Sequence, residues 1–241
     1  MVDQLLEFER PLCTVDVVIF TVRDCTLQVL LVQRRADPIE PFPGQWALPG
    51  GFIDTTRDGD LATCALRKLR EKTGIETAYL EQLGSWGNGT RDPRGWSTTH
   101  VYFSLIPPND LELTPGGNAS DSRWFNITGG RVQQSLAFDH AVLFKAALAR
   151  LRAKVEYTSL PAFLMPTEFT LTELQCTYEI LLARELEKKA FRTRLLAAGL
   201  LDPVPRMKSG ANRPAQLYRL KRRRIPYLFS RPFGSAQSPR R

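Results

Sequence analysis

The sequence predicts an α+β protein with two domains, and three observations support this fold class. In the first half, alternating runs of β-branched residues predict strands, and two amphipathic segments predict helices. A second series of helix and strand patterns begins near residue 155. Charge changes sign there as well: residues 1–150 hold 15 Lys and Arg against 18 Asp and Glu, and residues 151–241 hold 18 against seven. This asymmetry predicts two modules, the second facing a polyanion, although a solvated basic tail also supplies part of the charge.

The first predicted domain, residues 1–154, is an α/β/α sandwich. The run TVDVVIFTVRDCTLQVLLVQ predicts two strands joined at residues 23–25, and a proline-rich loop over 36–45 precedes the short strand WALPGGFI. A helix is predicted over 61–73, where Gly74 suits a C-terminal cap, and a second one over 137–154. The remaining predicted elements are strands at 79–84, 100–106 and 122–125, with a loop over 85–98.

The second predicted domain, residues 155–222, has the element order of a winged helix-turn-helix. Thr170 and Glu173 form a capping-box pattern that predicts a helix from there to about residue 183. A basic helix over 188–199 follows, and then strands at 206–209 and 215–220 on either side of a turn at 210–212. Residues 223–241 are predicted to be a basic, flexible tail.

Composition narrows the class of protein. The N-terminus MVDQLLEFERPL lacks the basic and apolar regions of a secretory signal, and the apolar runs are too short to span a membrane. The four cysteines lie far apart, which favours reduced thiols over a disulfide or a structural zinc. We therefore expect a cytoplasmic protein without membrane contact.

The segment GGFIDTTRDGDLATCALRKLREKTGI, residues 50–75, predicts a diphosphate-binding site. Hydrolysis of a diphosphate needs divalent ions, and a helix holds them with carboxylates at i, i+3 and i+4. The segment resembles the Nudix box, G-x5-E-x7-R-E-U-x-E-E-x-G-U, in which Arg67 and Glu71 fit the pattern. Lys68 and Lys72 fall on two of its glutamates, which are principal metal ligands in active Nudix hydrolases.

The start of this box is irregular too, because two extra residues precede Arg67. No glutamate falls in register there, and Asp58 and Asp60 are the nearest acids. We therefore predict no catalytic residues, no bound metal and no required cofactor, with Mg²⁺ relevant only to a residual hydrolase activity. A simpler interpretation of Arg67 and Glu71 is an i,i+4 ion pair on the helix surface.

Several residues predict a pocket for a nucleotide-like ligand. Glycines allow a phosphate to approach the backbone closely, guanidinium groups bind diphosphates, and tryptophans could form an aromatic wall. Ordinary core packing is the alternative for each tryptophan. The candidate ligand-binding residues are Arg34, Trp46, Gly50, Gly51, Arg67, Glu71, Arg91, Arg94 and Trp96.

The basic helix and the wing predict contacts with double-stranded DNA. An arginine at 192 or 194 could bind guanine in the major groove, lysines would suit phosphates, and wing residues would lie near the backbone or minor groove. A solvated helix face is the alternative. The candidate DNA-binding residues are Lys188, Lys189, Arg192, Thr193, Arg194, Arg206, Lys208, Asn212 and Arg213.

Taken in order, the motifs QWALPGGFID, LRKLREKTGI, RDPRGWS, LAFDH and RPAQLYRL resemble the NrtR family, Nudix-related transcriptional regulators of NAD metabolism. The resemblance spans about residues 12–220. It implies a homodimer in which a Nudix domain senses ADP-ribose or a related NAD derivative and a winged helix binds operator DNA. It also implies repression of NAD biosynthesis or salvage genes, relieved when the metabolite binds.

Two rival functions remain open on the sequence. One is a metal-dependent Nudix hydrolase, an ADP-ribose pyrophosphatase with a basic C-terminal extension. The other is a Nudix-fold RNA-binding protein, because phosphates dominate the binding of RNA as well as DNA.

Overall fold

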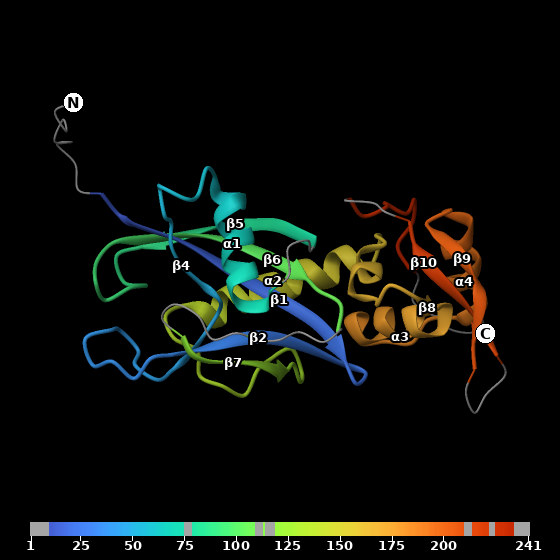
Figure 1. Ribbon diagram of the computed structural model, residues 1–241, viewed down its shortest axis with the longest axis horizontal. Helices are drawn as coiled ribbons and strands as arrows, with labels where there is room; N and C mark the ends of the chain where they lie inside the picture. The colour runs from blue at the N-terminus through green and yellow to red at the C-terminus, as the bar shows by residue number, and fades with distance from the viewer. Residues whose placement is uncertain are drawn as a thin grey trace, which may run out of the picture.

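The structure, a computed structural model, describes residues 10–74, 79–108, 113, 119–209, 214–221 and 225–233. A mixed sheet with two helices lies at one end of the elongated molecule, and a smaller domain lies at the other (Figure 1). The strands of the first domain are β1 Leu12–Arg23, β2 Thr26–Arg34, β3 Trp46–Ala47, β4 Gly50–Phe52, β5 Tyr79–Asn88, β6 Ser97–Leu105 and β7 Ala119–Asn126. Its helices are α1 Leu61–Thr73 and α2 His140–Val155.

The sheet is built around β1. Its strand order is β3-β2-β1-β6-β5, with β4 paired to β1 and β7 to β2, and β1 runs parallel to β6. The predicted hairpin of β1 and β2 is confirmed. Its turn residues Asp24 and Cys25 have φ of 46° and 54°, as a two-residue type I′ turn requires.

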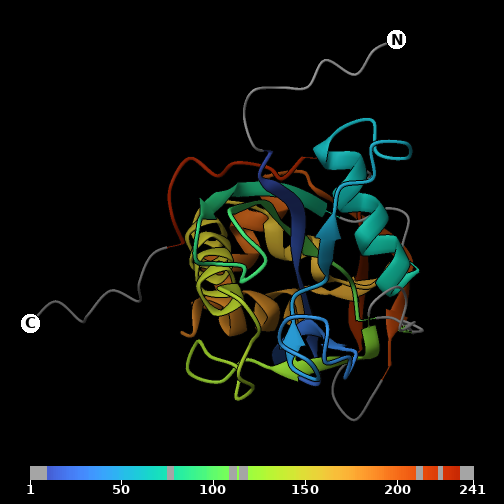
Figure 2. The ribbon, with the colours of Figure 1, turned by 90° about the vertical axis from the view of Figure 1, so that its left-hand side faces the viewer.

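The two helices of this domain cover opposite faces of the sheet, which confirms the predicted sandwich (Figures 1 and 2). Successive side chains of a strand point to opposite faces. Accordingly, Val17 and Ile19 of β1 pack with Leu69 of α1, whereas Val18 and Phe20 belong to the core that includes α2. Helix α1 has its predicted bounds and ends at Gly74 with φ 68°.

Strands β5 and β6 are longer than predicted. They pair from Tyr79–Leu105 to Asn88–Ser97 with one irregularity, so the connecting loop covers only residues 89–96. Gly87 disfavours a strand by itself, but the ring of Trp96 lies against its backbone, 3.1 Å from where a Cβ would be. Pairing with the neighbouring strand therefore outweighs local propensity here.

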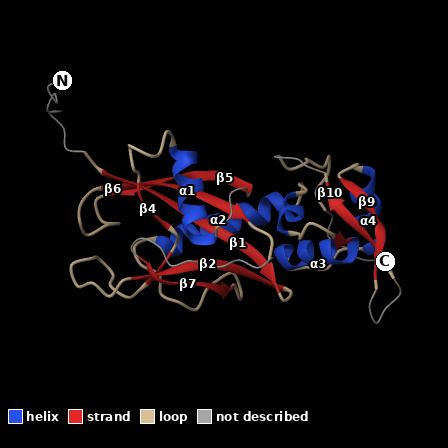
Figure 3. Ribbon diagram, in the orientation of Figure 1, coloured by secondary structure: helices blue, strands red, loops and turns tan. Residues whose placement is uncertain are grey.

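The C-terminal domain has the predicted winged helix-turn-helix order. Figure 3 shows its helices and strands at the end of the molecule opposite to the mixed sheet. Helix α3 begins at a complete capping box formed by Thr170 and Glu173. Strand β9 begins earlier than predicted, since its prolines at 203 and 205 are tolerated on an edge strand of the sheet β8-β10-β9. The elements are β8 Phe169–Thr170, α3 Leu171–Leu182, α4 Lys188–Ala197, β9 Leu201–Lys208 and β10 Ala215–Leu220.

One continuous apolar core joins the two domains. It extends from β1 across α2 and the 3-10 helix Leu160–Leu164 to Tyr178 and Leu195 in the C-terminal domain. The thiol of Cys25, at the tip of the first hairpin, also contacts Cys176 of α3. Within the described residues, no helix is both long and apolar enough to cross a membrane.

Residues 225–233, here called the C-terminal strap, differ from the predicted flexible tail. Phe229 and Phe233 are buried, and their rings pack on one another, 5.1 Å apart. The backbone N–H groups of the same two residues donate to the carbonyls of Tyr157 and Glu156, at 2.8 and 2.6 Å. The strap thus packs against the segment that connects the domains, because its aromatic residues supply an apolar face. The basic, proline-containing composition of this segment had predicted a flexible tail instead.

Candidate functional site

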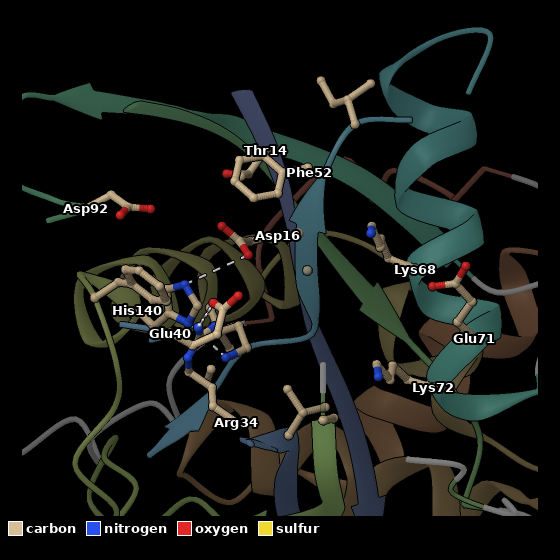
Figure 4. A pocket seen from close by; sticks show the side chains of 18 of the residues that line it. Thr14, Asp16, Arg34, Glu40, Phe52, Lys68, Glu71, Lys72, Asp92 and His140 are labelled. Carbon is tan, nitrogen blue, oxygen red and sulfur yellow. Dashed lines mark hydrogen bonds and ion pairs between the residues drawn. The ribbon is translucent and has the colours of Figure 1, made fainter. Parts of the chain in front are cut away.

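A cavity of about 560 Å³ lies in the N-terminal domain, between the glycines of β4 and one face of α1. Figure 4 shows its side chains converging from α1, from β1 and from the start of α2. The sequence-predicted residues among its lining are Arg34, Gly50, Gly51, Arg67, Glu71, Arg91 and Arg94.

The two predicted tryptophans are not part of this lining. Alternation along β3 places Ala47 on the cavity side and turns Trp46 the other way, where its ring meets Phe125 at 4.7 Å. Trp96 is 55% exposed and lies over Gly87. The aromatic lining comes instead from Phe52 and Phe138, which sequence reasoning missed.

Two arginine–aromatic pairs form one side of the cavity. The guanidinium of Arg34 lies 5.0 Å from the Phe138 ring centroid, and that of Arg94 lies 5.1 Å from that of Phe52. Glu40 accepts a hydrogen bond from Arg34 at 3.0 Å and lies 3.7 Å from Arg94. Cation–π pairs of this kind present flat surfaces with donors at their edges, which suits a nucleobase or a sugar phosphate.

Asp16 of β1 is a buried carboxylate of the cavity that the sequence analysis did not single out. It accepts a hydrogen bond from Thr99 at 2.7 Å and lies 3.9 Å from Arg91 and 3.8 Å from His140. Its Oδ1 lies only 1.9 Å from where a Cβ would stand on Gly50. A side chain at position 50 would therefore collide with Asp16, which explains the glycine.

The start of α2 is attached to the cavity by buried polar contacts. Arg91 makes a bidentate pair with Asp139, at 3.0 and 2.8 Å. His140 accepts the N–H of Leu48 on Nδ1 at 2.9 Å, so its proton lies on Nε2, facing Asp16. Burial lowers the pKa of His140, which keeps the ring neutral at physiological pH.

The box arginine of α1 is held by two carboxylates. Arg67 bonds Asp58 through Nε at 2.7 Å and pairs with Glu71 at 3.0 Å, so the i,i+4 ion pair is present. The Arg67 guanidinium holds the pKa of Asp58 well below its usual range. Asp60 caps α1 by accepting the N–H of Thr63 at 2.6 Å. Both acids near the start of the box therefore have structural partners.

A divalent ion does not fit these residues. Glu71, the one box glutamate that α1 presents to the cavity, already pairs with Arg67, and Lys68 and Lys72 line the cavity on the same helix. Like charge at these positions opposes a cation. Among the described residues, no group of three or more His, Cys, Asp or Glu is arranged to hold a metal ion.

The C-terminal domain presents a basic surface on α4 and β9. Lys188, Lys189 and Thr193 are exposed, and so are Arg206 and Lys208 of β9. Arg192 is half-buried and donates to Thr172 at 3.0 Å. Together with part of β10, residues of this surface line a groove of about 930 Å³, including Lys188, Arg192 and Lys208.

Arg194 lies elsewhere. Its guanidinium stacks on Phe229 and Phe233 of the strap, at 4.7 and 4.2 Å, and donates to the carbonyl of Pro232 at 2.8 Å. Two residues further along a helix, a side chain points about 200° away, so Arg192 and Arg194 cannot share one face. Asn212 and Arg213, predicted for the wing, lie outside the described residues.

Both domains match known families. Residues 14–146 match the NUDIX domain model, and residues 161–220 match the model of the NrtR DNA-binding winged helix domain. A relative named ADPR responsive transcriptional repressor NtrR, from Acinetobacter baylyi, is 46% identical over 228 residues, which cover 95% of this chain and 89% of the relative.

Solved structures with both domains are similar as well. The crystal structure of Shewanella oneidensis NrtR aligns with a TM-score of 0.82 at 42% identity and covers 92% of this chain and 99% of that one. Its complex with a 27mer DNA aligns with a TM-score of 0.80 at 40% identity, with the same coverage. The NUDIX domain of that protein complexed with ADP ribose aligns with a TM-score of 0.54 at 45% identity, covering 60% of this chain and 90% of that one. The chain therefore belongs to the NrtR family, with a Nudix domain followed by an NrtR DNA-binding winged helix domain.

Proposed function

We propose that this protein is a transcriptional repressor of NAD biosynthesis or salvage genes, and that ADP-ribose binding in the Nudix cavity releases it from operator DNA. The observation that carries the proposal is similarity over both domains to a protein solved with DNA and, in its NUDIX domain, with ADP ribose. The domain boundaries at 154/155 and 222/223 stay predictions. A homodimer working in the cytoplasm, with one winged helix for each half of the operator, belongs to the same proposal.

Helix α2 supports coupling between the two sites. It begins at His140, which lines the cavity, and ends at Val155 in the core that continues into the C-terminal domain. A ligand that moves Arg91 would act on Asp139 and thus on the start of α2. A displaced α2 would change the spacing of the two winged helices in a dimer, and a coupling free energy of about 1–3 kcal/mol would lower DNA affinity about 5–150-fold.

A mobility-shift titration tests the repressor proposal. Full-length protein would be bound to the promoter of a NAD-synthesis gene, and ADP-ribose would be added at increasing concentration. We expect the shifted band to disappear with ADP-ribose and to persist with unrelated nucleotides at equal concentration. Operator binding that ignores every NAD-related metabolite would exclude the switch.

We infer that hydrolysis is not the principal activity. A Nudix domain can also be catalytic, so an ADP-ribose pyrophosphatase is the rival function. The support for a regulator is the placement of Lys68 and Lys72 in the cavity and the pairing of Glu71 with Arg67. Release of AMP from ADP-ribose in Mg²⁺ or Mn²⁺, abolished in Glu71→Gln, would establish the enzyme instead.

A further inference from the structure

The cavity face of α1 carries a pair of ammonium groups. Lys68 and Lys72 are four residues apart, and so they lie on one side of the helix about 6 Å apart along its axis. Figure 4 shows Lys68 and Lys72 on the side of α1 that faces the strands, with Glu71 on the same helix between them. Glu71, the carboxylate on this part of the helix, is paired with Arg67 at 3.0 Å.

Lys68 lies against bare backbone. Its Nζ is 3.2 Å from the position that a Cβ would occupy on Gly51, and Gly51 has φ 140°, a conformation that L side chains rarely adopt. The wall opposite α1 therefore has no side chain at this point. An anion entering between the two could approach the ammonium group and the strand backbone at once.

Lys72 is a buried lysine that lines the same cavity. Its residue is only 6% exposed, and burial lowers the pKa of its ammonium group while Glu71 raises it. An anion that reaches this part of the cavity meets a cation that solvent screens weakly.

We propose that Lys68 and Lys72 bind the diphosphate of the ligand directly, in the role that divalent cations take when carboxylates line this helix face. The inference rests on the proposed function for the identity of the ligand as ADP-ribose. A diphosphate diester carries one negative charge on each phosphoryl group, and two ammonium groups about 6 Å apart along the helix axis can each donate to one of them. The site would not need Mg²⁺.

Calorimetric titration of the full-length protein tests this inference, with ADP-ribose and ADP as probes, in EDTA and in Mg²⁺. The wild-type protein is expected to bind ADP-ribose equally well in both buffers. Lys68→Met and Lys72→Met should each weaken binding about tenfold or more, as expected for a charge-assisted contact. Arg70→Met is the matched control, because Arg70 is an exposed cation of the same helix that does not line the cavity.

A charge reversal gives a second readout. Lys68→Glu combined with Lys72→Glu places three carboxylates on one face of α1, at positions 68, 71 and 72. We expect this variant to lose ADP-ribose binding in EDTA and to regain part of it in Mg²⁺. Circular dichroism and thermal melting of each variant show whether it is folded.

The outcomes separate the two proposals. Wild-type protein that binds ADP-ribose only with Mg²⁺, or methionine variants that match Arg70→Met, would overturn the lysine assignment and leave the repressor function intact. Wild-type protein that binds neither ADP-ribose nor ADP in EDTA would also overturn it. Metal-independent binding of ADP through the lysines, with operator binding indifferent to ADP-ribose, would overturn only the proposed function.

Discussion

Helices α1 and α4 are both short and basic, yet their lysines lie in different surroundings. On α1, Arg67 is enclosed by two carboxylates and Lys72 is buried beside a cavity. On α4, Lys188 and Lys189 are exposed to solvent. Similar composition therefore produces two different kinds of cationic site.

The difference lies in the surroundings of each charge. A buried cation is weakly screened and binds a small anion of fixed geometry, whereas exposed cations bind an extended polyanion through an interaction that salt weakens. The N-terminal site is consequently suited to one metabolite and the C-terminal surface to a nucleic acid. Four predictions test this contrast, in order of decreasing effect.

Asp58→Asn should produce the largest change, because it removes the buried partner of Arg67. We expect a loss of about 3 kcal/mol of unfolding free energy, near the lower end for breaking a buried pair since Glu71 still bonds Arg67. The ion pair lowers the pKa of Asp58, so its stabilisation is complete above the ordinary carboxylate pKa of about 4 and is lost as the pH falls through the folded-state pKa.

Urea unfolding at several pH values measures this effect. Asp60→Ala is the matched variant, because Asp60 belongs to the same turn but only caps α1. The loss of unfolding free energy in this variant should be clearly smaller, as expected for a lost N-cap. Equal losses in the two variants would show that burial of the Asp58 pair contributes nothing.

Arg192→Ala tests the basic surface of the C-terminal domain. Arg192 is a groove-lining arginine that the helix presents beside Lys188. If it binds a base, its loss should lower operator affinity by about 1–3 kcal/mol and relax sequence preference at one position. Fluorescence anisotropy on operator and scrambled DNA measures both, and Lys145→Ala, an exposed charge on α2, should change neither. A uniform loss on both DNAs would identify a phosphate contact instead.

Asp139→Asn tests the connection between the two regions. Asp139 anchors Arg91 but does not line the cavity, so ADP-ribose affinity should change little. We expect the release of DNA by saturating ADP-ribose to weaken by about 0.5–2 kcal/mol of coupling. The measurement is operator affinity with and without ADP-ribose, with Asp121→Asn as the control. Unchanged coupling would exclude this route through α2.

Glu168→Gln should have the smallest effect, and it should strengthen DNA binding. Glu168 pairs with Arg206 and with Arg219, the latter at 2.7 Å, and so neutralises part of the wing. Exposed ion pairs contribute little, so we expect a gain in affinity of no more than about fivefold and a steeper dependence on salt. A weaker complex would mean that Glu168 positions the two arginines for DNA.

Much of the fold followed from local signals. Helix α1 has a capping aspartate, an apolar stripe and a terminal glycine, and each of these acts within a few residues. The capping box of α3 is equally local. The strap was missed because Phe229 and Phe233 follow no helical or strand period, and their burial depends on a partner far away in the chain.

The candidate site was less predictable than the fold. The glycines and arginines of the cavity could be named because their chemistry suits phosphates. Phe52 comes from a short strand and Phe138 lies two residues before α2, and no spacing relates them. Trp46 lies on the side of its strand away from the cavity, and Arg194 lies on a different side of α4 from Arg192, where it stacks on Phe233. Strand register and helix phase determine on which side of its element each of these side chains lies.

The continuous core between the domains has a consequence for the lifetime of the protein. Because the domains share buried side chains from Val18 to Phe233, we expect a single cooperative unfolding transition rather than one for each domain. A metabolite bound only by the folded state would then protect the whole chain, including the winged helix domain, against proteolysis. An effector that releases such a regulator from its promoter would also protect the released protein from degradation, so that it can bind DNA again.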